Sequence, residues 1–172
     1  MTSSAEPPAV VFVGPMGAGK TSIGRRVARG LGVGFTDTDR VVVQEHGPIP
    51  DIFAAHGEAR FREWEREAVT QSLQRGGVIS LGGGAVLDAG TRAALAGHRV
   101  VFLTVTPRAV SARIRDGNRP LVEGDDPLAR WQQIFDERRP LYEEVADRTF
   151  DTSSGPITGV ADAILDWLRG EK

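Results

Sequence analysis

The stretch Gly14-Pro15-Met16-Gly17-Ala18-Gly19-Lys20-Thr21 constrains this chain more than any other, because it fills every fixed position of the pattern G-x-x-x-x-G-K-[ST]. It directly follows the apolar run Val10-Val11-Phe12-Val13. A β-branched strand, a glycine-rich turn and then a helix form the context in which this pattern binds phosphate through backbone N–H groups. Lys20 is then expected to reach the β- and γ-phosphates, and Thr21 to offer its hydroxyl to Mg²⁺. The alternative is a plain glycine-rich turn between a strand and a helix.

The size and charge of the chain indicate an ordinary globular domain. Its 172 residues suffice for one core, and a formal net charge of −2 gives no electrostatic reason for a nucleic-acid partner. The chain has no cysteine, which excludes a disulfide framework and a thiol nucleophile. Residues 1–9 lack the features of a signal peptide, and no apolar run approaches the roughly 20 residues of a membrane helix. We therefore expect one domain over 1–172 with a loose tail at 1–9, cytoplasmic and monomeric, without a membrane partner.

Short apolar runs alternate with helical patterns along the chain, which predicts an α/β fold with a parallel sheet covered on both faces. Ligands of such sheets lie at the carboxyl ends of the strands, so the following loops are expected to carry the function. Residues 116–126, rich in Gly, Pro and charge, are expected to form a mobile loop. Strands are predicted near 10–13, 33–36, 78–81, 100–103 and 148–150, and helices near 21–31, 41–45, 51–55, 58–75, 88–96, 107–115, 127–145 and 157–168.

Several classes of phosphate-loop protein can be excluded. A GTPase needs the guanine-reading pattern Asn-Lys-x-Asp, but Asn118 is the only asparagine of the chain. The central runs 78–81 and 100–103 do not end in a carboxylate, so the acidic candidates are Asp37 and Asp39. A small kinase that acts on a soluble acceptor remains.

Asp37-Thr38-Asp39 places two carboxylates at alternate positions after a predicted strand. One could face Mg²⁺ while the other accepts a hydrogen bond from an acceptor hydroxyl, and the alternative is a cap of the following helix. Gly82-Gly83-Gly84 would bring bare N–H groups to an anion or would simply form a tight turn. Arg62 and Arg138 are either solvated helix arginines or forks for a planar carboxylate.

The chain resembles the shikimate kinase family in the order and spacing of its motifs. These motifs are Gly14-Pro-Met-Gly-Ala-Gly-Lys-Thr21, Asp37-Thr-Asp39, Phe61-Arg62, Leu81-Gly-Gly-Gly84, Arg119-Pro-Leu121 and Arg138-Arg-Pro-Leu-Tyr142. The resemblance covers residues from Val10 to about Leu168. It implies ATP-dependent phosphorylation of the 3-hydroxyl of shikimate in aromatic amino-acid biosynthesis. It also implies a three-layer α/β/α fold of the nucleoside-monophosphate-kinase type, with a central five-stranded parallel sheet and a lid at about 113–127.

The resemblance also implies a role for each matching residue. The ATP phosphates would be held by Gly17, Ala18, Gly19, Lys20, Thr21 and Ser22, with Arg115 and Arg119 at the nucleotide; Mg²⁺ would be held by Thr21 directly and by Asp37 through water. Shikimate would be bound by Asp39, Arg62, Gly82, Gly83 and Arg138, between the apolar walls Phe53 and Phe61. Lys20, Asp39 and Arg119 would be catalytic, with Asp39 holding the reacting hydroxyl, whether or not it takes the proton. Glu65 would orient Arg62 from one helical turn away.

Two other functions stay open at this point. One is a different small-molecule kinase of the same architecture, such as a gluconate or nucleotide kinase. The other is a shikimate-sensing domain without turnover, against which the presence of Lys20, Thr21, Asp39 and Arg119 together argues.

Overall fold

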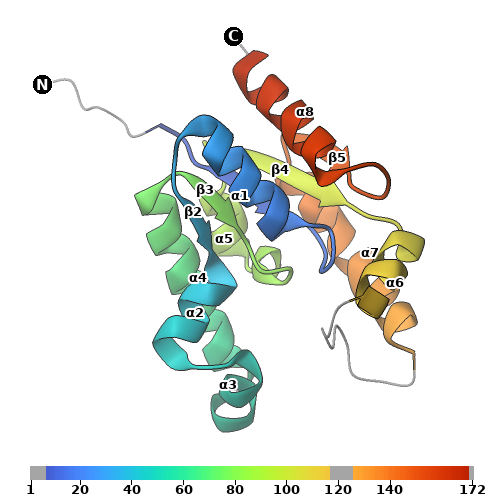
Figure 1. The fold of residues 1–172 in the computed structure, drawn as a ribbon. Coiled ribbons are helices and arrows are strands. Elements are labelled where there is room, and N and C mark those ends of the chain that lie inside the picture. The colour runs from blue at the N-terminus through green and yellow to red at the C-terminus, as the bar shows by residue number, and fades with distance from the viewer. Residues whose placement is uncertain (1–6, 117–125, 171–172) are drawn as a thin grey trace, which may run out of the picture.

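The computed structural model describes residues 7–116 and 126–170, which form a parallel five-stranded sheet in the order β2-β3-β1-β4-β5 (Figure 1). The strands are β1 (Val10–Val13), β2 (Phe35–Asp37), β3 (Val78–Ser80), β4 (Arg99–Thr104) and β5 (Arg148–Asp151). The helices are α1 (Lys20–Leu31), α2 (Thr38–His46), α3 (Ile49–His56), α4 (Glu58–Arg75), a 3₁₀ turn η1 (Ala85–Leu87), α5 (Ala89–Ala94), α6 (Pro107–Asp116), α7 (Pro127–Val145) and α8 (Ile157–Gly170). None of the helices in these two segments is long and apolar enough to cross a membrane.

Helices cover both faces of the sheet, as the sequence predicts. Helices α1 and α8 pack against each other on one face, and α4, α5 and α7 lie on the other (Figure 1). The central strand β1 is buried along its whole length, and so are the inner residues of β4. A strand buried on both faces needs apolar side chains at successive positions, which explains the continuous runs in the sequence. The predicted α/β/α fold is confirmed.

The sheet register brings three loops to one edge. Phe12 of β1 pairs with Ser80 of β3, and Asp37 of β2 pairs with the same Ser80. The strands are parallel, so the glycine-rich loop, Asp37 and the residues after Ser80 all leave the sheet at its carboxyl edge. This alignment assembles the candidate site.

The second strand begins later than the sequence predicts. Gly32 ends α1 in the left-handed conformation (φ 69°), and the N–H of Val33 still donates to Ala28 O of the helix. Val33 therefore belongs to the helix cap and is 45% exposed, so β2 starts at Phe35 and includes Asp37. The next helix consequently starts at Thr38 and not near Val41.

Helices α2, α3 and α4 form a smaller layer at the carboxyl edge (Figure 1). Its own small core consists of Val42, Ile52, Phe61 and Ala68. The helix α4 has the predicted bounds, and its first turns carry Arg62 and Glu65 to the sheet edge. The layer thus forms one wall of the candidate site.

The expected tail and lid fall largely outside the described residues. Residues 1–6 and 117–125 are not among them, and of the predicted tail only 7–9 are. Ala9 is fully buried, and its N–H donates to Nδ1 of His98 at 3.0 Å. The packed domain therefore begins no later than Ala9.

Candidate active site

The glycine-rich loop is held by hydrogen bonds to its carbonyl oxygens. Lys20 Nζ donates to Gly14 O (2.6 Å) and to Pro15 O (3.1 Å). The next three carbonyls accept from side chains of distant segments: Met16 O from Trp131 Nε1 (2.9 Å), Gly17 O from Arg113, and Ala18 O from Thr152 Oγ1 (2.8 Å). The carbonyls of residues 14–18 are thus all engaged.

These contacts determine where the N–H groups of the loop point. The carbonyl of one residue and the N–H of the next point in opposite directions across a trans peptide, and no cis peptide occurs among the described residues. Outward carbonyls at Met16 and Ala18 therefore turn the N–H groups of Gly17 and Gly19 to the opposite side. Positive φ angles at Gly17 (82°) and Gly19 (91°) make this loop conformation available only to glycine at low cost.

The start of α1 is prepared for an anion. Gly19 is its N-cap, and no side chain caps the first turn. The free N–H groups and the positive end of the helix dipole favour a phosphate at this point. Burial lowers the pKa of Lys20 to about 8, although the carboxylates of Asp39 and Asp37 act in the opposite direction. A phosphate group would reverse that effect by stabilising the ammonium.

Asp37 performs two tasks at the end of β2. Its Oδ1 caps α2 by accepting the N–H groups of Asp39 (3.0 Å) and Arg40 (3.5 Å). Its Oδ2 accepts the hydroxyl of Thr21 at 3.3 Å. The helix-cap interpretation of the sequence is therefore correct for Asp37, and its second oxygen also lies beside Thr21, the other residue predicted to hold Mg²⁺. The described residues contain no cluster of three or more metal-ligating side chains. Two oxygen donors beside a phosphate site nevertheless suit Mg²⁺, which takes few protein ligands.

Asp39 lies at the centre of the site. A Cβ built on Gly82 would come within 2.5 Å of Asp39 Oδ1, so the carboxylate packs directly against the backbone of the triple-glycine loop. Burial, and then the charge of Asp37, raise the pKa of Asp39 above its ordinary value, against the opposing charges of Lys20 and Arg62. The site thus holds a carboxylate whose affinity for a proton is increased.

Arg62 is positioned by two acidic partners on its own helix. Its guanidinium lies 2.9 Å from Glu65 Oε1 and 3.5 Å from Glu58 Oε1. Glu65 is buried, and burial raises its pKa despite the ion pair with Arg62. The predicted contact between Arg62 and Glu65 is present. A Cβ at Gly84 would lie 2.6 Å from Arg62 Nη1, so only glycine leaves room for the guanidinium.

The second arginine approaches the same loop from α7. A Cβ on Gly83 would lie 3.5 Å from Arg138 Nη1 and 3.6 Å from the hydroxyl of Tyr142. That hydroxyl donates to Gly83 O at 2.6 Å, and burial raises the pKa of Tyr142 to about 12. Tyr142 therefore stays protonated and fixes the triple-glycine loop between the two arginines.

The N–H groups of the triple-glycine loop are not equivalent. Gly82 N donates to Thr38 Oγ1 at 3.2 Å, so its N–H is already satisfied inside the protein. The N–H groups of Gly83 and Gly84 donate to no atom of the described residues. A ligand would thus meet the free N–H at Gly83 and Gly84, while Gly82 provides close approach for Asp39. The rings of Phe53 and Phe61, predicted to be the apolar walls, pack against each other with 5.1 Å between their centroids.

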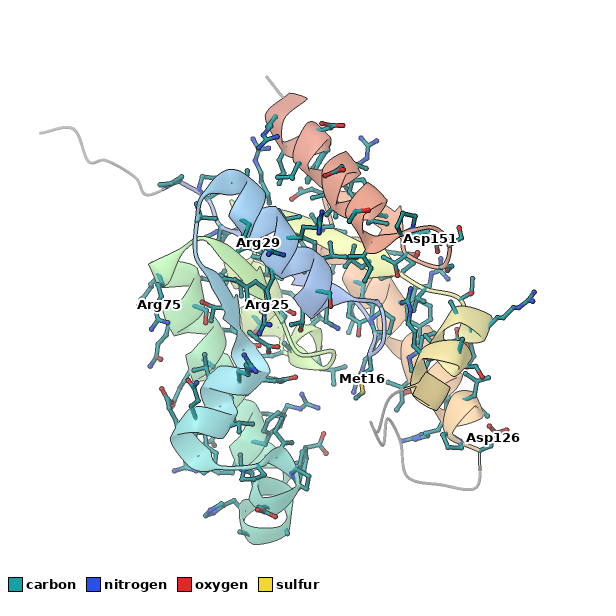
Figure 2. All side chains as sticks on the ribbon, in the orientation of Figure 1. Met16, Arg25, Arg29, Arg75, Asp126 and Asp151 are labelled. Atoms are coloured by element: carbon teal, nitrogen blue, oxygen red, sulfur yellow. The ribbon has the colours of Figure 1, made fainter. Side chains whose placement is uncertain are left out.

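Two of the predicted nucleotide residues cannot be placed. Arg119 lies outside the described residues, and only the backbone of Arg115 is described, within α6. The motifs of the sequence do not include three residues that hold the loop, namely Arg113, Thr152 and Trp131. Trp131 is 3% exposed and packs in the core, but its indole N–H also reaches Met16 at the loop tip, whose side chain is labelled in Figure 2. No local sequence pattern predicts these contacts, because each joins residues 96 or more positions apart.

Known proteins with similar sequences identify the family of this chain. A family model described as Shikimate kinase matches residues 16–169. A shikimate kinase of Mycobacterium tuberculosis is 47% identical over 166 residues, which cover 94% of each chain. The chain belongs to the shikimate kinase family. Members of this family are ATP-dependent kinases, and this member has the phosphate loop that such an activity needs.

Solved structures agree with this assignment. The shikimate kinase of Acinetobacter baumannii, solved in complex with shikimate, superposes with a TM-score of 0.89 at 36% identity and covers 97% of this chain and 96% of its own. A gluconokinase of Sinorhizobium meliloti superposes with a TM-score of 0.65 at 20% identity, covering 95% and 93%. The latter likeness shows a shared fold only, so the shikimate kinase family is favoured over the gluconate kinase alternative.

The anchoring of the loop by Trp131 can be tested with Trp131→Phe. The change keeps an aromatic ring against Phe135 but removes the donor to Met16 O. We expect kcat/KM for ATP to fall by roughly two- to tenfold, the effect of losing one hydrogen bond worth about 0.5–1.5 kcal/mol. The KM for shikimate should stay unchanged. Steady-state rates with each substrate varied provide the measurement.

Trp167→Phe is the matched control. Trp167 lies in α8, away from the loop, and packs against Phe150 of β5. Equal losses of kcat/KM for ATP in both variants would show that the indole of Trp131 acts only through general packing.

Proposed function

We propose that this protein transfers the γ-phosphoryl group of ATP to the 3-hydroxyl of shikimate, giving shikimate 3-phosphate and ADP. The observation that carries the proposal is the position of Asp39. Its carboxylate lies against Gly82, and the charges of Lys20 in the phosphate loop and, more weakly, of Arg62 in the opposite wall both act to lower its pKa. Asp39 therefore links a site for the phosphoryl donor with a site for an anionic, hydroxyl-bearing acceptor.

The donor half consists of the loop and the start of α1. Gly17, Ala18, Gly19, Lys20, Thr21 and Ser22 would surround the ATP phosphates, and Lys20 would exchange its contacts with Gly14 O and Pro15 O for phosphate oxygens. Thr21 and Asp37 would hold Mg²⁺, which neutralises phosphate charge when it is bound. The distance of 3.3 Å between Thr21 Oγ1 and Asp37 Oδ2 already brings both oxygens to one point.

The acceptor half would bind shikimate by its carboxylate and hold its hydroxyl. Arg62 and Arg138 flank the triple-glycine loop and would bind the planar carboxylate through their guanidinium forks. The N–H of Gly83 would add a donor, and Gly82 would keep the ring close to Asp39. The ring itself would lie on Phe53 and Phe61.

The transfer step then follows from the placement of Asp39. The 3-hydroxyl oxygen forms a bond to the γ-phosphorus while the bond from that phosphorus to the ADP oxygen breaks. The hydroxyl proton passes to the carboxylate of Asp39, whose raised pKa favours its acceptance. Lys20 neutralises the charge that moves onto ADP, and its neighbouring N–H groups require no reorientation during the step.

The remaining roles rest on the family resemblance. Arg119, carried by a lid at about 113–127, would close over ATP and neutralise charge, and Arg115 would assist at the nucleotide. Closure would exclude water, which otherwise competes with shikimate for the phosphoryl group. We also propose that the protein acts as a cytoplasmic monomer without a nucleic-acid or membrane partner. Its formal net charge of −2 argues against nucleic-acid binding.

The experiment that tests this function measures ADP release from Mg-ATP with shikimate, gluconate, nucleoside monophosphates or no acceptor. We expect release that depends on shikimate and accompanies stoichiometric shikimate 3-phosphate. ADP release with gluconate and not with shikimate would show that gluconate is the acceptor. Shikimate binding without any ADP release would support a sensing domain.

Asp39→Asn tests the central residue. The amide keeps the size of the side chain but cannot accept the proton, so kcat should fall by roughly two or more orders of magnitude. ATP binding should change little. Because the pKa of Asp39 is raised, the acid limb of the wild-type kcat/KM profile should lie above the ordinary range of an aspartate. Near-normal turnover of the variant would contradict the assigned role.

The same variant has a stability signature. A carboxylate whose pKa is raised by folding destabilises the protein once it is ionised, and this penalty is fully present above its folded-state pKa. Asp39→Asn should therefore unfold at a higher temperature than the wild type near pH 7.5. The difference should shrink as the pH falls and the wild-type carboxyl becomes protonated. Thermal unfolding at several pH values checks this.

Arg62→Ala tests the carboxylate site. The change should raise the KM for shikimate by an amount equivalent to about 2–4 kcal/mol, the loss seen when one partner of a desolvated charge pair is removed. The KM for ATP should change little. Arg60→Ala is the control, since Arg60 lies on the same helix and pairs with exposed Glu63. Normal shikimate binding by Arg62→Ala would show that this arginine does not hold the carboxylate.

A further inference from the structure

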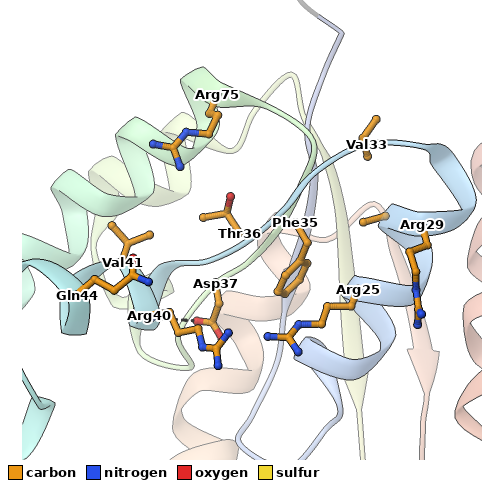
Figure 3. A pocket seen from close by; sticks show the side chains of 11 residues that line it. Arg25, Arg29, Val33, Phe35, Thr36, Asp37, Arg40, Val41, Gln44 and Arg75 are labelled. Atoms are coloured by element: carbon orange, nitrogen blue, oxygen red, sulfur yellow. Dashed lines mark hydrogen bonds between the residues drawn. The ribbon is translucent and has the colours of Figure 1, made fainter.

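A groove of about 690 Å³ lies between α1, β2, α2 and α4, beside the candidate active site (Figure 3). Four arginines line it: Arg25 and Arg29 from α1, Arg40 from α2 and Arg75 from the end of α4. Figure 2 shows Arg25 and Arg29 on α1 and Arg75 on α4, all three away from Met16 at the tip of the phosphate loop. Elements distant in the sequence thus bring four arginine side chains to the lining of one hollow.

These four side chains lack anionic partners in the described part of the chain. Their guanidinium groups form no hydrogen bond or ion pair with the described residues. Arg25 alone makes a cation–π contact there, with its guanidinium 5.6 Å from the centroid of the Phe35 ring. The other exposed arginines of α4 differ, since Arg60 pairs with Glu63 and Arg66 with Asp88. The groove therefore carries concentrated positive charge that the described residues do not neutralise.

A single carboxylate, that of Asp37, borders the groove, and it is already engaged. It accepts the N–H groups of Asp39 and Arg40 and the hydroxyl of Thr21. Figure 3 shows Arg25 and Arg40 directed towards Asp37, but neither forms an ion pair with it. Four positive charges thus face one negative charge that other groups already bind.

Helix dipoles account for only part of this arrangement. Arg29 and Arg75 lie in the last turns of α1 and α4, where a positive charge is favourable. Arg40 lies in the first turn of α2, where a positive charge is unfavourable, and Arg25 lies in the middle of α1. An anion in the groove would offset the unfavourable position of Arg40 and the mutual repulsion of all four.

The rest of the lining indicates the kind of anion. Val33, Phe35 and Val41 supply an apolar surface between the arginines. The volume lies in the range of small-molecule sites, and guanidinium forks match the geometry of carboxylate and phosphate groups. We propose that this groove binds a small organic molecule that carries two or more carboxylate or phosphate groups. The groove shares one residue, Asp37, with the proposed metal site, but its four arginines belong neither to the proposed shikimate site nor to the ATP site. The proposal does not depend on the proposed function.

The test uses the full chain saturated with Mg-ADP and shikimate, so that the proposed active site is filled. The probe is 3-phosphoglycerate, which carries one carboxylate and one phosphate on a short carbon chain. Backbone ¹H–¹⁵N spectra during a titration should show saturable shifts at Phe35, Thr36, Arg40 and Gln44. Inorganic phosphate, with one anionic group, should bind at least tenfold more weakly.

The groove variant is the double substitution Arg29→Gln with Arg75→Gln, because Arg25 and Arg40 adjoin Asp37 and would disturb the proposed metal site. It should weaken binding of the probe by about tenfold. The control, Arg26→Gln with Arg148→Gln, makes the same change in net charge outside the groove and should bind the probe normally. Both variants should keep wild-type turnover.

Three results would overturn the proposal. The first is an absence of saturable shifts at the groove amides. The second is an equal loss of binding in both double variants, which would indicate a general charge effect. The third is equal affinity for inorganic phosphate and 3-phosphoglycerate, which would show that the groove does not select two anionic groups.

Discussion

The outward hydrogen bonding of the phosphate loop is the constraint on which the rest of the structure depends. Backbone N–H groups can surround an anion only if the carbonyls of the same peptides point elsewhere and find partners there. The carbonyls of Met16, Gly17 and Ala18 find them in α7, α6 and the residue after β5. The strand order places these elements around the end of β1, so the sheet topology and the anion site have a common cause.

The charged side chains of the site lower the stability of the free protein. Asp39 is half-buried beside another carboxylate, and both factors disfavour its ionised form. Lys20 is half-buried as well, and its desolvation disfavours its charge. Such charges destabilise the empty protein. The phosphates of ATP would offset the cost at Lys20, and bound Mg²⁺ would offset the cost at Asp39. The charged groups that the proposed reaction needs are therefore groups whose charge lowers the stability of the free protein.

The arginines of the chain fall into classes that burial and neighbours distinguish. Arg62 has a buried acidic partner that fixes its orientation, and Arg113 spans from α6 to the phosphate loop and Thr152. Arg25 and Arg40, by contrast, face a groove in which the described residues offer no ion pair. Local helix pattern alone does not distinguish these arginines from solvated ones. Their surroundings separate the arginine that anchors the loop from those proposed to bind substrate or a further ligand.

The sequence by itself determined the α/β class, the phosphate loop and most of the secondary structure. Buried parallel strands and amphipathic helices have local patterns, and the bounds of α4 and α7 are those predicted. It also determined, through motif order, the family and the candidate residues Asp39, Arg62 and Arg138. The sequence misplaced the start of β2, because the N–H of Val33 donates to Ala28 O and so places Val33 in the C-terminal cap of α1.

Only the tertiary structure decided which groups hold the loop and which N–H groups stay free. The indole of Trp131, the hydroxyl of Thr152 and the N–H of Gly82 find their partners across distances of 44 to 134 positions in the chain. Such contacts leave no periodic or spaced pattern, because they arise from the alignment of strand ends and not from neighbours in sequence. Hydrogen-bond partners and buried charges are properties of the assembled sheet edge, and they become visible only when that edge is formed.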